Sequence, residues 1–129
     1  MIFQEKIKKL RNYLFGFEDV IFAICYGDYL KDIGYKNSKL GLAIYFKDKK
    51  SFKELIELLG FIASKFYENI ELIYLNEKLE SYSPVFLMNL LDTGATLFVK
   101  NQKLLDKWSV NVINYYYDTS KVREKFYYV

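Results

Sequence analysis

Two apolar runs separated by a glycine turn constrain the fold of this chain more than any other feature. The first run, Val20 to Tyr26, stops at Gly27 and Asp28, and the second run extends from Leu40 to Phe46. Between them, Tyr29 to Ile33 can form one or two helical turns with Asp28 as the N-cap. An almost wholly apolar strand is typical of the centre of a layered α/β domain, where both of its faces are covered.

Helical and strand patterns continue through the rest of the chain. A serine at position 51 with a glutamate three residues later has the spacing of a capping box at a helix start. We expect the helix that follows to turn these residues inward: Leu55, Ile56, Leu58, Leu59, Ile62, Ala63 and Phe66. We expect helices over Ile2 to Phe15, Phe52 to about Tyr67 and Val85 to Asp92. Strands are expected over Ile70 to Leu75 and Ala95 to Val99. The last segment, Gln102 to Tyr128, is expected to be helical with a break near Asp118 to Ser120.

Composition excludes several classes of protein. The net charge is +3, from 19 Lys and Arg against 16 Asp and Glu, which is too mild to predict binding to nucleic acid. With no histidine, the commonest general base and metal ligand is absent. The single cysteine, Cys25, lies within an apolar run, so we expect a core residue in a cytoplasmic protein. The chain shows neither a membrane-spanning run nor a signal peptide, so no membrane association is expected.

The spacing of the two apolar runs resembles that of the minimal nucleotidyltransferases, the small members of the DNA polymerase β-like superfamily. In that family the first strand ends in Gly-Ser, and Asp-x-Asp opens the next strand after ten residues. Here Gly27 stands at the family's glycine, Asp28 at the serine, Lys39 at the first aspartate and Gly41 at the second. The resemblance implies a nucleotidyltransferase fold of α/β (α+β) class over residues 1–129, one domain with a mixed sheet of about four strands flanked by helices.

These substitutions remove the chemistry that the family motif supplies. Two carboxylates on alternate residues of one strand hold divalent metal ions against the nucleotide phosphates, and the ions neutralise charge on the transferred group. The ammonium of Lys39 would repel Mg²⁺, Gly41 offers no ligand, and the carboxylate of Asp28 would repel phosphate. We therefore predict no catalytic residue, no metal site and no nucleotide cofactor.

Glu71 lies in the expected strand that resembles the family's third core strand, where a carboxylate often completes the metal site. We predict an ion pair between Glu71 and Lys39 as the successor of that site. The alternative is a solvent-exposed Glu71, because the parity of a short strand is easily misread.

Tyrosines gather in the last segment of the chain, where they form two clusters. Three consecutive tyrosines cannot all face one side of a helix, so at least one of them meets solvent or a partner. Tyrosine is favoured at protein interfaces, and core packing with a wet rim is the alternative reading. The candidate interface residues are Tyr115, Tyr116, Tyr117, Tyr127 and Tyr128.

The resemblance implies a function that needs no catalysis. Minimal nucleotidyltransferases pair with small helical HEPN-domain proteins, typically ribonucleases, and active members transfer AMP to a tyrosine of that partner. We expect an inactive antitoxin or interaction module that binds a HEPN-domain protein, with a homo-oligomer as a further option. Two alternatives stay open: Lys39 contacts a nucleotide phosphate without metal, or residual AMP transfer, with Mg²⁺ and ATP, uses a site rebuilt from Asp28, Asp32 and Glu71.

Overall fold

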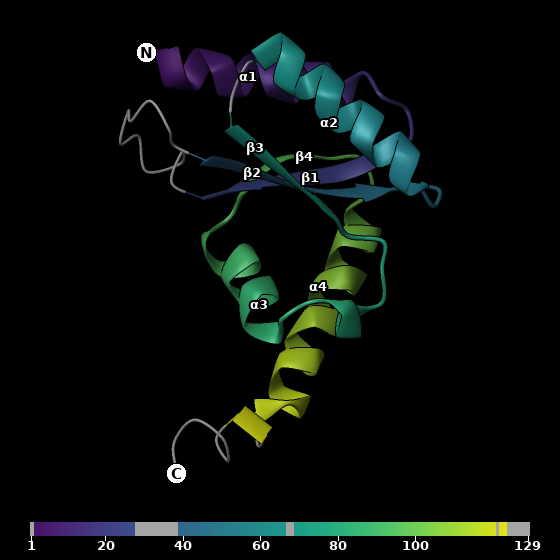
Figure 1. The fold of residues 1–129 in the computed structure, drawn as a ribbon. Helices are drawn as coiled ribbons and strands as arrows, with labels where there is room; N and C mark the ends of the chain where they lie inside the picture. Colours follow the sequence, from purple (N-terminus) through teal and green to yellow (C-terminus); the bar gives the residue numbers. More distant parts are fainter. Residues whose placement is uncertain (1, 28–38, 67–68, 121, 124–129) are drawn as a thin grey trace.

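A mixed sheet with helices on both faces forms the protein, as the computed structural model shows for residues 2–27, 39–66, 69–120 and 122–123 (Figure 1). No helix in this described part is long and apolar enough to cross a bilayer. The elements follow one another as α1 (Ile2–Phe15), β1 (Val20–Tyr26), β2 (Lys39–Phe46), α2 (Phe52–Phe66), β3 (Asn69–Tyr74), the 3₁₀ turn η2 (Leu79–Ser81), α3 (Pro84–Thr93), β4 (Ala95–Val99) and α4 (Gln102–Asp118).

The four strands of the sheet stand in the order β3-β2-β1-β4. Strand β1 pairs antiparallel with β2 and β4, whereas β2 pairs parallel with β3. Helix α2 makes the crossover that a parallel pair requires. This arrangement confirms the predicted mixed sheet of four strands flanked by helices. The short helix predicted over Tyr29 to Ile33 lies outside the described residues.

Two helices cover each face of the sheet, with α1 and α2 on one side and α3 and α4 on the other (Figure 1). Strand β1 contributes to the core on both sides, since Ala23 and Cys25 pack toward α1 and α2 while Phe22 and Ile24 pack toward α3 and α4. The prediction of a strand covered on both faces is therefore confirmed. Cys25 is fully buried, and burial raises the pKa of its thiol to about 12.

The start of α2 has the predicted capping box. The Ser51 N–H donates to Glu54 Oε1 at 3.1 Å, and the Glu54 N–H donates to Ser51 Oγ at 3.2 Å. The prediction that Ile56 faces inward is wrong, because its side chain is 50% exposed. Ile56 is rotated by roughly 100° about the helix axis from Leu55, which packs toward the core, so a helix resting on a sheet leaves it on the flank.

The C-terminal helix breaks where the polar residues cluster, as predicted. Helix α4 ends at Asp118, and Thr119 caps it with its N–H donating to the backbone oxygens of Tyr115 and Tyr117. The Thr119 hydroxyl also donates to the oxygen of Tyr115 at 3.0 Å. A threonine side chain that bonds the preceding turn competes with helix continuation, which explains the break.

Candidate functional site

The residues of the family-like motif come together at one end of the sheet. Tyr26 of β1, Gly41 of β2 and Glu71 of β3 stand opposite one another in the strand register. Ala43 and Ile73, two positions further along their strands, belong to the core under α3 and α4. Because alternate residues of a strand share a face, positions 41 and 71 also point to the α3 and α4 side.

An ion pair joins two positions of this motif. Lys39 Nζ lies 3.5 Å from Glu71 Oε2, so the ion pair predicted from the sequence is present. Both side chains are partly exposed to solvent, which weakens the attraction between their charges. The ammonium therefore stands where the resembled family places a metal-binding carboxylate.

The second motif position is covered by an aromatic ring. A Cβ atom on Gly41 would lie 2.2 Å from Cζ of Tyr26, closer than any real contact allows. The ring of Phe86 packs edge-on against that of Tyr26, with 5.4 Å between centroids, and holds it from the α3 side. The space that a side chain at position 41 would need is thus filled.

The Tyr26 hydroxyl is buried and has no hydrogen-bond partner within the described part of the chain. Burial raises the pKa of this hydroxyl, and the negative charge of Glu71 and the approach of its carboxylate to the hydroxyl raise it further, although the two groups do not reach hydrogen-bond geometry. Sequence reasoning missed Tyr26 as a site residue. The only signal for it is its place next to Gly27 in the chain, and the register that puts it opposite Gly41 becomes visible only in the folded sheet.

Gly27 retains the turn that ends the first strand. Its φ is +104°, and a Cβ atom there would lie 2.9 Å from the Lys39 backbone oxygen, so glycine is required by both conformation and space. The backbone frame of the motif therefore persists although its side chains have changed. Four predicted residues lie outside the described part of the chain: Asp28, Asp32, Tyr127 and Tyr128.

The described residues at the motif do not fit a divalent metal ion. Among Tyr26, Gly41 and Glu71, which stand opposite one another on three strands, Glu71 alone carries a carboxylate. The ammonium of Lys39 lies beside it. Mg²⁺ prefers several hard oxygen ligands in near-octahedral geometry. Nowhere in the described ranges do three or more His, Cys, Asp or Glu side chains gather as metal ligands would.

The three consecutive tyrosines of α4 have different surroundings. The Tyr115 hydroxyl donates to the backbone oxygen of Tyr82 at 3.1 Å, which ties α4 to the segment before α3. The guanidinium carbon of Arg123 lies 4.0 Å from the ring centroid of Tyr116. Tyr117 is 63% exposed. The prediction that at least one of the three meets solvent is confirmed, and Tyr117 is that residue.

Comparison with known proteins places this fold. Residues 8–103 match the family model described as Polymerase beta, Nucleotidyltransferase. One chain of a toxin-antitoxin structure with AMP-PNP shares 19% sequence identity over 93% of both chains, with a TM-score of 0.73. One chain of the toxin-antitoxin MntA-HepT structure shares 20% sequence identity, over 95% of this chain and 93% of that chain, with a TM-score of 0.70.

A third solved structure is a complex between an MNT antitoxin and a tri-AMPylated HEPN toxin from Shewanella oneidensis. The matching chain shares 18% identity over 95% of this chain and 93% of its own length, with a TM-score of 0.71. At such identities the three likenesses establish a common fold. No curated protein matches the chain.

Proposed function

This chain belongs to the polymerase β nucleotidyltransferase family, and we propose that it is an inactive member, a single domain that acts by binding a HEPN-domain protein. The observation that carries the loss of catalysis is the Tyr26 ring over Gly41. Transfer of a nucleotidyl group depends on metal ions held in fixed geometry. One motif position here carries an ammonium paired with Glu71, and the other is a glycine that supplies no carboxylate and lies under the Tyr26 ring.

The partner is inferred from the structures that share the fold. The similar chains come from toxin-antitoxin structures, one of them between an MNT antitoxin and a HEPN toxin. Helix α4 of this chain exposes Val110, Ile113 and Tyr117, spaced to form one stripe along the helix. Apolar and tyrosine side chains on one exposed stripe are suited to a protein interface. We assign the HEPN-domain partner to this stripe.

The pair would act in the cytoplasm, where the free Cys25 thiol stays reduced. Inhibition of the partner would then be steric, through occupation of its surface rather than through modification of its tyrosine. The Lys39 ammonium already has a carboxylate partner, which counts against the alternative that it holds a nucleotide phosphate.

Calorimetric titration with ATP and with Mg²⁺, together and separately, tests the loss of catalysis. We expect no heat of binding in any of the three titrations. Binding of ATP that requires Mg²⁺ would overturn the proposal, because it would show a metal-dependent nucleotide site. Binding of ATP without metal that disappears in Lys39→Ala would instead support the phosphate-contact alternative.

Co-expression with a HEPN-domain protein encoded beside this chain's gene tests the partner. We expect the two proteins to purify as a complex, and Tyr117→Ser to weaken that complex at least roughly tenfold because exposed tyrosines often dominate interfaces. Phe52→Ser is the matched control, since Phe52 is 79% exposed but lies on α2, across the sheet. Failure of the proteins to associate would refute the partner assignment, and equal weakening by both variants would refute the assigned stripe.

A further inference from the structure

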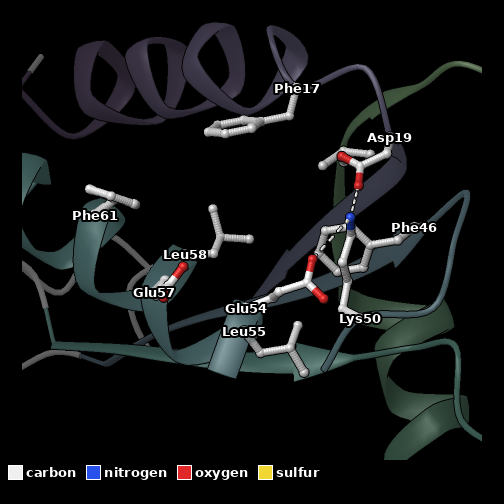
Figure 2. Close-up of a pocket in the computed structure, with 10 residues that line it drawn as sticks. Phe17, Asp19, Phe46, Lys50, Glu54, Leu55, Glu57, Leu58 and Phe61 are labelled. Carbon is white, nitrogen blue, oxygen red and sulfur yellow. Dashed lines mark ion pairs between the residues drawn. The ribbon is translucent and has the colours of Figure 1, made fainter. Parts of the chain in front are cut away.

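A groove opens on the face of the sheet opposite the motif, between the segment after α1 and helix α2 (Figure 2). Its volume is about 200 Å³. The side chains drawn in Figure 2 converge on it from α2, from the strand ends and from the α1–β1 connection. The apolar lining consists of Phe17, Val20, Phe46, Leu55, Leu58 and Phe61.

The walls of the groove are held in place while its mouth stays open. Val20 and Phe46 are buried and form the base. The ring of Phe17 packs edge-on against Tyr13, with 5.2 Å between centroids, so one wall is fixed by α1. Phe61 on the other side is 62% exposed. A preformed apolar cavity edged by an exposed aromatic ring is the form that binding sites take.

The rim of the groove carries an excess of negative charge. Among its charged lining residues, three carboxylates stand against one ammonium. Lys50 forms an ion pair with Asp19 and lies 3.8 Å from Glu54, whereas Glu57 has no ion pair with another described residue. The hydrogen bond to Asp19 raises the pKa of Lys50 and so favours its charged form. The rim remains acidic on a chain whose net charge is +3.

The size of the groove limits what can enter. Sites for drug-sized ligands occupy roughly 300–1,000 Å³, so a cavity of about 200 Å³ takes a single large side chain rather than a nucleotide. Opposite charge at the rim steers a cationic segment here and disfavours an acidic one. We propose that this groove docks a protein segment in which one large apolar side chain is flanked by lysine or arginine. This site lies apart from the motif and does not depend on the partner assigned to α4.

Three short peptides serve as probes of that chemistry: acetyl-Lys-Phe-Arg-amide, acetyl-Glu-Phe-Glu-amide and acetyl-Lys-Ala-Arg-amide. Each is titrated into the isotopically labelled full chain, and backbone amide shifts are followed by NMR. We expect saturable shifts around Val20, Phe46 and Leu58 with the first peptide alone, at a dissociation constant of roughly 1 mM. Equal binding of the acidic peptide, or shifts confined to other surfaces, would overturn the proposal.

Two variants with matched controls separate the apolar and charged contributions. Phe61→Ser should weaken binding of the first peptide about tenfold, whereas Phe52→Ser on the same helix should leave it unchanged. Glu57→Lys should weaken it about fivefold, whereas Glu80→Lys in η2, which lies away from the groove, should not. The side chains of Phe61 and Glu57 are exposed, so we expect both variants to fold. A free protein that is dimeric, and that Phe61→Ser turns into a monomer, would mean that a second copy fills the groove and that the proposal is wrong.

Discussion

The two faces of the sheet differ in whether side chains of the chain itself cover the site on them. On the α3 and α4 face, the Tyr26 ring lies over Gly41, and Glu71 lies beside Lys39. On the α1 and α2 face, the groove edged by Phe61 is open, and three carboxylates and one ammonium line its rim (Figure 2).

This difference predicts that the two faces respond differently to mutation. Side chains that pack inside the molecule contribute to stability and can be probed by unfolding, whereas an open apolar groove is probed by the binding of the proposed peptide segment. The face that carries the family motif is therefore expected to respond to mutation as a core, and the opposite face as a surface.

The largest effect is expected from adding a methyl group at Gly41. Gly41→Ala must displace the Tyr26 ring from its packing against Phe86, so we expect a loss of about 2 kcal/mol in the free energy of unfolding. Gly60→Ala on α2 is the matched glycine, because nothing lies within 4 Å of the added methyl. We expect it to stabilise by about 1 kcal/mol through helix propensity.

Urea denaturation of both variants measures this contrast. Combining Gly41→Ala with Tyr26→Ala should recover at least roughly 1 kcal/mol relative to the sum of the single effects, because the clash then disappears. An unchanged stability of Gly41→Ala would mean that the ring leaves position 41 freely. The Tyr26 ring would then not fill the space over Gly41 in the folded protein.

A smaller effect is expected from removing the Tyr26 hydroxyl. Its oxygen is buried, and the nearby Glu71 carboxylate does not reach it in hydrogen-bond geometry, so Tyr26→Phe should leave stability unchanged or raise it by up to about 1 kcal/mol. The measurement is again the free energy of unfolding in urea. A loss exceeding about 1 kcal/mol would show that the hydroxyl makes a hydrogen bond, with Glu71 as the nearest acidic candidate.

Much of this contrast could be predicted from the sequence, and the missing part has a physical cause. The resemblance to the family's third core strand predicted the ion pair of Lys39 with Glu71, and the two residues lie on neighbouring strands, with Glu71 directly opposite Gly41. The position of Tyr26 could not be predicted, since it depends on how β1 and β2 align across the described sheet. The spacing of apolar residues predicted that Ile56 faces inward, but 50% of its side chain is exposed. Such spacing does not show how much of the helix surface the sheet buries.

The groove was missed for a related reason. Its lining combines residues from the α1–β1 connection, the ends of β1 and β2, and α2. No stretch of the chain carries a recognisable signature of it. The exposed Phe61 is a hint that becomes readable only once α2 is oriented on the sheet.

Ion pairs on the two faces should differ by a few tenths of a kcal/mol. The Lys50 and Asp19 side chains are less exposed than those of Lys39 and Glu71, so we expect coupling energies of about 1 and about 0.5 kcal/mol, respectively. Double-mutant cycles with alanine, measured by urea denaturation at low salt and in 1 M NaCl, test this. A larger coupling at Lys39 and Glu71 would mean that the motif pair is better shielded than its exposure indicates.

The smallest effect concerns acid and the rim of the open groove. Hydrogen bonds from Ser51, first from its backbone N–H and then from its hydroxyl, lower the pKa of Glu54 below its ordinary value of 4.5, and nearby Lys50 lowers it further. A carboxylate whose pKa is lower in the folded state contributes stability that is complete above the unfolded pKa. That stability is lost as the pH falls through the folded value. Thermal stability should therefore decline below about pH 4.5, in part through Glu54.

Glu54→Gln isolates this contribution, because the amide oxygen still accepts the Ser51 hydrogen bond but does not ionise. We expect its melting temperature to fall less between pH 5 and pH 3 than that of the natural chain, and Glu80→Gln, in η2 away from the capping box, serves as the control. A parallel decline of all three proteins would show that Ser51 does not favour the ionised carboxylate. The capping box would then act as a neutral pair of hydrogen bonds, and the acidity of the groove rim near α2 would rest on Glu57 and Asp19.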